Sequence, residues 1–366
     1  MGRRMAAASA VLIGVLLAGC GSRAALASLQ RDAARETAEK QEALVVYGIT
    51  DSWSAWAAIQ QGFAAKYGIR VDLQHKDWGS RQIIEGFKAE DGPQADVGLV
   101  ESSFARWGAQ EGVLLSYAPT RWDEIPSNRR DRSGYGWSAA FAGTIAFVVN
   151  TDKTGFQPRG FRELTDPRLR GLVAILDPLN HGQGSGAVLA AAYATDTGGE
   201  RNIAPGVDLW RQVAAAGNLR VVEALSPEDL TSGRVGVGVL WDFNALTWQE
   251  ALQAPQLRVY LPEDGTASLD YAVVINRAAP HPNAARLFVE YVLSGDGQTL
   301  LADGHAVPVL TDDAILASAQ KDFKAPHDRL TLATRPSSLN AWYLDTTAIL
   351  PDLWSQQVLP LLPSGG

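Results

Sequence analysis

Short apolar strands alternate with amphipathic helices through the first third of the chain, and this alternation constrains the fold more than any other feature. Three strand patterns are each followed by a helical pattern, in the order 43–47, 53–67, 69–73, 80–90, 96–100 and 102–111. The helical stretches carry apolar residues three or four positions apart, and each stops at or near a glycine. A regular alternation of this kind predicts a mostly parallel sheet with helices on both faces.

A second alternation follows a strand pattern at 145–150 and predicts a second unit of the same class. Its strand patterns lie at 173–176, 220–222 and 235–240, with helical patterns between them. A chain of 366 residues is long enough for two domains of ordinary size. The pattern therefore predicts an α/β protein of two lobes, each with its own sheet, and a ligand cleft between them.

Ligands of such sheets bind beyond the carboxyl ends of the strands, so the loops that follow the strands are candidate contacts. These loops are rich in Ser, Trp, Asp and Gly, the mixture of small polar and aromatic residues that is typical of a binding site. They span residues 50–53, 77–80, 101–103, 182–186 and 241–244.

A glycine-rich segment joins the strand at 173–176 to an alanine-rich helix. Asp177-Pro178 ends the strand, and glycines follow at 182, 184 and 186. The N–H groups at the start of a helix attract anions, and we expect an oxyanion at Gly184, Ser185, Gly186 and Ala187, with Ser185 as the helix N-cap. The structural alternative is a flexible turn between strand and helix. The segment has neither the lysine of a nucleotide P-loop nor the spacing of a nucleophile elbow, which favours binding over catalysis.

Composition narrows the possible partners. The formal net charge is −8, and nucleic-acid binding would call for a basic face. The five histidines show no metal-ligand spacing, so we expect neither a metal site nor a cofactor. His181 with Ser185 is the only local base–nucleophile candidate, and no third group orients it. We therefore expect no catalytic residue and no enzymatic activity.

The amino terminus has the features of a bacterial lipoprotein signal. Arg3 and Arg4 precede an apolar stretch at 6–17 that is too short to span a bilayer. The stretch ends in Leu-Ala-Gly-Cys20, which resembles a lipobox. The resemblance implies a signal peptide at 1–19, lipidation of Cys20, a linker at 20–42 and a protein anchored to the membrane in the periplasm or cell envelope. A plain secretory signal with a chance cysteine is the alternative.

The chain resembles the periplasmic substrate-binding proteins of ABC transporters, in the group that handles ferric iron, polyamines and phosphonates. The resemblance rests on residues 44–47, 78–87, 95–97, 143–150, 199–206, 242–244 and 284–288. It implies a two-lobed Venus flytrap fold of type II that closes by a hinge at crossing strands near 148–150 and 265–271. Residues 43–147 with 269–366 would form lobe one, and residues 148–268 lobe two. A monomer would carry its small-molecule ligand to an ABC permease driven by a cytoplasmic ATPase.

The expected ligand follows from where the chain matches this family and where it departs from it. Ferric-binding members hold iron with two adjacent tyrosines, whereas Trp241 and Asp242 stand here. The segment 185–187 matches the anion-binding helix start of the same members. Trp241 and Asp242 resemble the aromatic and carboxylate groups with which polyamine-binding members hold an ammonium. The structural alternatives are a core role for Trp241 and a helix N-cap role for Asp242.

A phosphonate-like zwitterion or other oxyanion is thus expected first, then a polyamine, then ferric iron. A sensor lobe and an envelope hydrolase are the rival functions. The residues expected to contact the ligand are Ser52, Trp53, Trp78, Ser80, Glu101, Ser102, Gly184, Ser185, Gly186, Ala187, Trp241, Asp242, Asn244 and Asp270.

Overall fold

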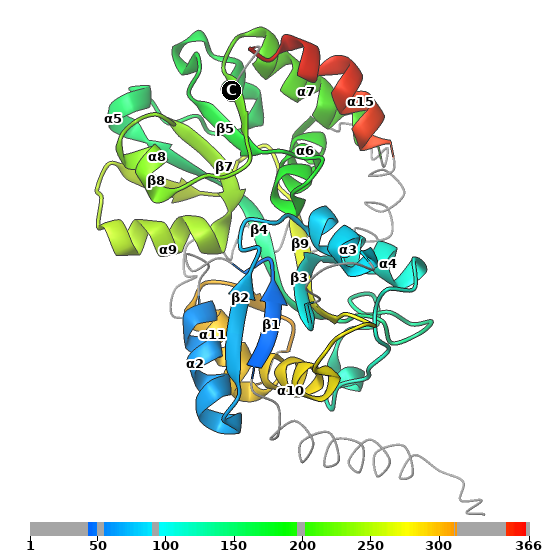
Figure 1. Ribbon diagram of the computed structural model, residues 1–366. Helices are drawn as coiled ribbons and strands as arrows, with labels where there is room; N and C mark the ends of the chain where they lie inside the picture. The colour runs from blue at the N-terminus through cyan, green and yellow to red at the C-terminus, as the bar shows by residue number, and fades with distance from the viewer. Residues whose placement is uncertain are drawn as a thin grey trace, which may run out of the picture.

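A computed structural model describes residues 43–49, 55–89, 95–195, 202–310, 312 and 349–363. The signal peptide, Cys20, the linker, Ser52 and Trp53 lie outside the described residues. The described part forms two α/β lobes, one above the other in Figure 1, which meet where the strands β4 and β9 run. The expected α/β class and two-lobed fold are confirmed.

Lobe one begins with the expected alternation of strands and helices. Strand β1 pairs in parallel with β2 and with β3, and the helices bury apolar faces against this sheet, as α3 does with Ile83, Ile84 and Phe87. Helix α2 ends at Gly68, whose φ of 73° is a left-handed conformation that favours glycine. The elements are β1 (Ala43–Tyr47), α2 (Trp56–Tyr67), β2 (Arg70–Gln74), α3 (Ser80–Lys88), β3 (Val97–Glu101) and α4 (Ser102–Gln110).

Strand β4 (Ala139–Asn150) joins the two lobes. Its first half pairs with β9 (Ser268–Ile275) and β10 (Val307–Pro308), and its second half pairs with β7 (Val237–Trp241) and β8 (Leu257–Tyr260). All twelve residues of β4 are buried. Among the described residues the strands therefore form one continuous sheet, in the order β2-β1-β3-β9-β4-β7-β5-β6, rather than one separate sheet in each lobe.

Lobe two holds the second alternation. Strand β5 pairs in parallel with β6 and β7, and helix α6 packs against α7. The elements are α5 (Thr151–Thr154), β5 (Val173–Leu176), α6 (Gly182–Thr195), α7 (Ala204–Ala215), β6 (Leu219–Val222), α8 (Pro227–Thr231), β7, α9 (Asp242–Leu252) and β8. Short 3₁₀ helices lie at Phe161–Thr165, Pro167–Leu169 and Leu359–Leu361, and another lies at Trp122–Glu124 in lobe one.

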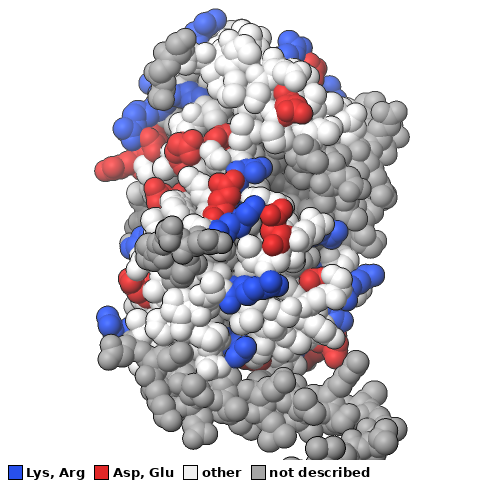
Figure 2. All heavy atoms as spheres, turned by 45° about the vertical axis from the view of Figure 1, so that its right-hand side comes forward, with Lys and Arg blue, Asp and Glu red and all other residues white. Residues whose placement is uncertain are grey.

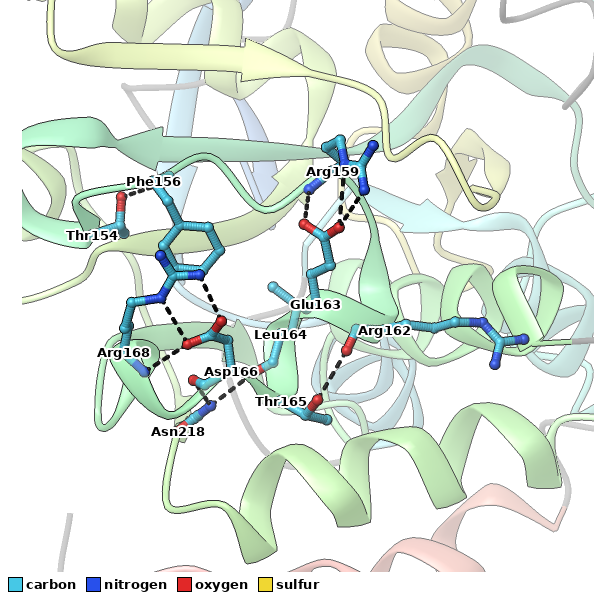
Figure 3. A network of polar contacts seen from close by, with 10 residues as sticks. All are labelled: Thr154, Phe156, Arg159, Arg162, Glu163, Leu164, Thr165, Asp166, Arg168 and Asn218. Atoms are coloured by element: carbon cyan, nitrogen blue, oxygen red, sulfur yellow. Dashed lines mark hydrogen bonds and ion pairs between the residues drawn. The ribbon is translucent and has the colours of Figure 1, made fainter.

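Polar contacts fix the chain just before β5, at the outer end of lobe two (Figure 3). Asn218 Nδ2 donates to the carbonyl oxygens of Leu164 and Asp166, each at 2.8 Å. Asp166 accepts from Arg168 at 2.7 Å, and the Arg168 guanidinium lies 3.7 Å from the ring centroid of Phe156. These contacts hold the segment that leads into β5, and the glycine-rich segment follows that strand.

The two connections between the lobes lie side by side. The Ile145 N–H donates to the Ala267 carbonyl at 2.9 Å, and Ser268 Oγ donates to the Gly143 carbonyl at 3.2 Å. The pairing partners of β4 change between Thr144 and Ile145, so its crossing point lies there and not at 148–150 as expected. The reason is that residues up to Asn150 stay paired with strands of lobe two. The second expected crossing, 265–271, contains the observed one.

The helices near the end of the chain divide between the lobes. Helix α10 (Pro282–Val292) and helix α11 (Gly295–Asp303) contact α2 and lie in lobe one. Helix α15 (Leu350–Gln357) instead packs against α7 at the top of Figure 1, with Trp354 fully buried. This contact differs from the expected assignment of all of 269–366 to lobe one.

Candidate functional site

A cavity of ≈ 270 Å³ lies between the lobes and has walls from both. Lobe one contributes the loop 76–80 with Gly48 and Leu99, and Tyr271 comes from β9. Lobe two contributes Leu176, residues 181–183 and 223–225, Asn244 and Trp248. Most of these residues follow the carboxyl end of a strand, as expected for a ligand site in this kind of sheet. The expected residues Trp78, Ser80 and Asn244 line the cavity.

Three helices begin at the wall of this cavity. Gly79 and Ser80 stand at the start of α3, Gly182 and Gln183 at the start of α6, and Asn244 in the first turn of α9. The positive ends of three helix dipoles thus point toward one small space, which favours a negatively charged group there.

The unpaired backbone N–H groups at the start of α6 belong to residues earlier in the sequence than the expected 184–187. The Ser185 N–H bonds to the His181 carbonyl at 3.1 Å, and the N–H groups of 182–184 have no backbone acceptor among the described residues. Ser185 is not the N-cap, because the helix starts at Gly182 and Ser185 Oγ donates to the Gly182 carbonyl at 3.1 Å. Gly186 and Ala187 face the core, since Gly186 packs on Trp241 and Ala187 accepts from Trp210 Nε1.

The two lobes touch at the mouth of the cavity. A Cβ built on Gly79 of lobe one would lie 2.1 Å from the Asn180 carbonyl oxygen of lobe two. Arg81 Nε donates to the Leu179 carbonyl at 3.0 Å across the same boundary. The structure therefore shows the lobes in a closed arrangement, held in part by backbone-to-backbone contact at a glycine.

Glu101 and Ser102 do not line the cavity and lie in the layer of residues behind its wall. The buried Glu101 carboxylate accepts from Ser102 Oγ at 2.8 Å, from Ser103 N at 3.0 Å and from Ser103 Oγ, and Ser80 Oγ accepts from the Glu101 N–H at 3.0 Å. Burial raises the pKa of Glu101 to about 7, although the serine hydrogen bonds oppose this shift. Glu101 therefore anchors α3 and α4 and does not line the cavity.

Trp241 and Asp242 also lie behind the cavity wall. Trp241 is fully buried, and its Nε1 donates to the Tyr271 hydroxyl at 3.1 Å. Asp242 Oδ1 accepts from the N–H groups of Thr144 and Phe243, each at 2.9 Å. Burial raises the pKa of Asp242 to about 7, against the effect of these hydrogen bonds. Trp241 thus has the core role of the structural alternative, and Asp242 is the first residue of α9 and bonds to the crossing strand.

Asp270 lies outside the cavity as well. Arg129 Nε donates to Asp270 Oδ1 at 2.9 Å, so this carboxylate is already in an ion pair within lobe one. Of the expected carboxylates, none lines the cavity; the acidic residues that do are Asp77 and Glu223. His181, another lining residue, has its Nε2 at 3.3 Å from Glu223 Oε2.

Sequence reasoning missed Tyr271, Trp248 and Glu223 as lining residues. Two of them carried a usable signal: Glu223 directly follows a strand pattern, and Trp248 lies one helical turn after Asn244 on the same face. Tyr271 lies opposite Glu101 in the β3–β9 pairing, which depends on strands far apart in sequence.

A larger cavity of ≈ 600 Å³ lies on lobe one and includes Arg106, Arg130, Arg132 and Arg277 in its wall. All of its lining residues belong to lobe one, so closure of the lobes cannot enclose a ligand there. We therefore assign the site to the smaller cavity between the lobes. On the face shown in Figure 2, acidic and basic side chains are interspersed rather than gathered into a patch of one sign.

The described residues hold no group of three or more His, Cys, Asp or Glu side chains that is arranged to bind a metal. Tyr271 lines the cavity, and burial raises the pKa of its phenol above the ordinary tyrosine value, so the phenol stays protonated.

Within the described ranges, no helix has the length and apolar character needed to cross a bilayer.

Comparison with known proteins gives a consistent result. Residues 93–330 match a family described as bacterial extracellular solute-binding protein. An uncharacterised protein of Haemophilus influenzae is 29% identical over an alignment of 275 positions, which covers 69% of this chain and 73% of that protein. The fold is similar to that of the periplasmic binding protein AfuA from Actinobacillus pleuropneumoniae with fructose-6-phosphate bound (TM-score 0.69, 21% identity, 87% of this chain and 99% of AfuA). It is also similar to iron-bound HitA from Pseudomonas aeruginosa (TM-score 0.63, 19% identity, 86% and 99%).

Proposed function

Because this chain belongs to the family of bacterial extracellular solute-binding proteins, we propose that it is the solute receptor of an ABC importer. It captures a small polar solute between its lobes and delivers it to a membrane permease driven by a cytoplasmic ATPase. The observation that carries this proposal is the cavity of ≈ 270 Å³ whose walls come from both lobes. A ligand that contacts both lobes stabilises the closed arrangement by its higher affinity for that state.

The ligand carries an oxyanion, with a phosphonate or phosphate as the first candidate. The N–H groups of Gly182 and Gln183 provide hydrogen-bond donors for such a group, and the starts of α3 and α9 add positive helix ends. The similarity to the fructose-6-phosphate-bound AfuA fold is compatible with this class of ligand. If the solute is a zwitterion, Asp77 and Glu223 replace Trp241 and Asp242 as the groups that face its ammonium.

A polyamine is the second candidate and ferric iron the third. A polyamine would use Asp77 and Glu223 but would leave the free N–H groups of α6 without an acceptor. Ferric iron favours anionic oxygen ligands, and Tyr271 stays a neutral phenol that already accepts a hydrogen bond from Trp241.

Gln183→Glu distinguishes an anion from a cation as the ligand. Gln183 is buried at the start of α6 and lines the cavity, so the change adds a negative charge with almost no change in shape. Affinity for 2-aminoethylphosphonate and inorganic phosphate, measured by titration calorimetry, should fall at least about tenfold because like charges repel. The exposed Gln61→Glu on α2 is the matched control and should leave both affinities unchanged.

Spermidine and ferric citrate are titrated in the same way to test the polyamine and iron alternatives. The oxyanion proposal is wrong if spermidine binds to the wild type while phosphate and the phosphonate do not, or if Gln183→Glu strengthens the binding of the anions. Binding of ferric citrate alone would identify the iron alternative instead.

The receptor is proposed to act as a monomer anchored in the cell envelope through lipidated Cys20. This cysteine lies outside the described residues, and the proposal rests on the lipobox-like Leu-Ala-Gly-Cys20 sequence. Cys20→Ala should move the protein from the membrane fraction to the soluble fraction. Retention of the variant on membranes washed with high salt would contradict the anchor.

A further inference from the structure

The cavity of ≈ 600 Å³ on lobe one concentrates positive charge on an acidic protein. Its described wall contains four arginines, Arg106, Arg130, Arg132 and Arg277, and one acidic residue, Asp131. The whole chain has a formal net charge of −8, so this excess of arginine is opposite in sign to the balance of the protein. Sites for small molecules have volumes of about 300–1,000 Å³, and this cavity falls within that range.

One face of α4 forms a wall of the cavity and carries Arg106. Ala109 and Gln110 lie three and four residues after Arg106, share its face of the helix and also line the cavity. The loop 127–137 packs on this face, since a Cβ built on Gly136 would lie 3.1 Å from the Ala109 Cβ. Arg106 therefore stands on the face of α4 that meets the loop.

Arg277, which follows β9, lies just beyond the end of α4. Its backbone N–H donates to the Val113 carbonyl at 2.8 Å, and its Nη1 lies 3.5 Å from a Cβ built on Gly112. Gly112 stands six positions after Arg106, a separation of about 9 Å along a helix axis. One small molecule can therefore reach both arginines from the cavity between them.

Two arginines of the loop 127–137 differ in their partners. Arg130 Nη1 donates to Asp123 Oδ1 at 3.1 Å, so this arginine is already in an ion pair. Arg132 instead donates from Nε and Nη2 to the carbonyl and hydroxyl oxygens of Ser127, at 2.8 and 2.9 Å. Ser127 is an uncharged lining residue, so it holds the Arg132 guanidinium at the cavity without neutralising it.

Asp131 does not neutralise the remaining charges either. Its carboxylate accepts from Ser133 N at 2.8 Å, from Ser133 Oγ at 2.7 Å and from Gly136 N at 3.0 Å, all within its own loop. Within the described part of the chain, neither Arg106 nor Arg277 forms an ion pair. Guanidinium groups bind phosphate and carboxylate through paired N–H bonds, so arginines without acidic partners at one cavity favour an anion there.

We propose that the cavity of lobe one binds a small molecule with two phosphate groups, at a site separate from the solute site. The three arginines without an acidic partner stand on three segments, Arg106 on α4, Arg132 on the loop and Arg277 after β9, so two groups contact them better than one. A phosphate monoester carries a charge of about −1.5 to −2 at neutral pH, and two of them match three guanidinium groups more closely than a dicarboxylate does. A ligand held by lobe one alone stays exposed when the lobes close, so it is not the transported solute.

Methylenediphosphonate, titrated calorimetrically, tests the proposal. The Gln183→Glu protein serves as the parent, because that change weakens anion binding between the lobes. The parent should bind methylenediphosphonate at least about tenfold more tightly than methylphosphonate. Arg132→Gln and Arg277→Gln each remove one exposed charge and should weaken this binding at least about fivefold. Arg70→Gln, an exposed change on β2 outside the cavity, is the matched control and should keep the parent affinity.

Two further readouts identify the kind of site. The radius of gyration in small-angle X-ray scattering should not change when methylenediphosphonate binds to the parent, because the described lining residues all belong to lobe one. Affinity should fall as the NaCl concentration rises, because salt screens exposed charges. A decrease in the radius of gyration would place the probe between the lobes and overturn the assignment.

The proposal is wrong if methylenediphosphonate does not bind, if both arginine variants bind it like the parent, or if methylphosphonate or succinate binds equally tightly. Vesicles of phosphatidylglycerol are the last probe. If they bind the protein through Arg132 while methylenediphosphonate does not, the cavity is a membrane contact and not a site for a small molecule. None of these outcomes bears on the solute site, which the phosphate titrations of Gln183→Glu against the wild type test separately.

Discussion

Gly79→Ala is expected to hold the lobes apart without harming either lobe. The added Cβ would lie 2.1 Å from the Asn180 carbonyl oxygen and 2.8 Å from its carbon, and both are backbone atoms of the opposite lobe. The oxygen distance is about 1.3 Å short of the 3.4 Å at which ordinary van der Waals contact begins. The backbone of Gly79, with φ −74° and ψ 167°, is open to any residue, so the substitution strains only the closed state.

The size of the effect follows from the cost of inserting a methyl group into a tight contact. Such overpacking costs about 1–3 kcal/mol, which corresponds to roughly 5- to 150-fold weaker apparent affinity when it falls on the ligand-bound state alone. Titration calorimetry with the tightest-binding phosphonate measures the loss. Small-angle X-ray scattering at saturating ligand should also give a larger radius of gyration for the variant than for the wild type.

A matched control separates closure from a general effect of alanine. Gly295 starts α11 in lobe one, and a Cβ there would meet nothing within 4 Å. Gly295→Ala should keep wild-type affinity and closure, and both variants should melt at or slightly above the wild-type temperature without ligand. If Gly79→Ala binds and closes like the wild type, the contact between Gly79 and Asn180 does not limit closure of the lobes.

Three further changes test other parts of the site. Asp242→Asn should raise the free energy of unfolding above that of the wild type by more at pH 8 than at pH 5, and calorimetric melts should show a difference on the order of 2–4 kcal/mol between the two gains. The reason is that a carboxyl whose pKa is about 7 in the folded protein makes the folded state less stable as the pH rises from about 4 to 7. An equal gain of the variant over the wild type at both pH values would contradict this. Ser80→Ala should cost about 1–3 kcal/mol in urea unfolding, because the buried Glu101 N–H loses its acceptor; no change in midpoint would oppose it. Arg81→Ala should weaken ligand affinity about two- to fivefold by removing the donor to the Leu179 carbonyl, and unchanged affinity would argue against a role in closure.

The fold was predictable from sequence because its signals are local. The alternation from β1 to α4 follows from short apolar runs, helical spacing and glycines at helix ends, and the structure has each element within a few residues of the expected bounds. The position of the crossing strand was less predictable. The length of β4 depends on pairing with β7 and β8, which lie about 100 residues further along the chain.

The candidate site was predictable in its loops but only partly in its side chains. Trp78, Ser80 and Asn244 line the cavity because they follow strand ends, which a sequence pattern can locate. Trp241 and Asp242 stand next to these loops, yet they face the core. Their direction is set by the register of β7 on β4, where Trp241 pairs with Ile145, and no local pattern encodes that register.

A crystal structure with a bound phosphonate would show which cavity holds the anion. We expect density between the lobes, with phosphonate oxygens at hydrogen-bond distance from the N–H groups of Gly182 and Gln183 and contacts to residues of both lobes. Density in the arginine-lined cavity of lobe one, with the space between the lobes empty, would contradict this expectation.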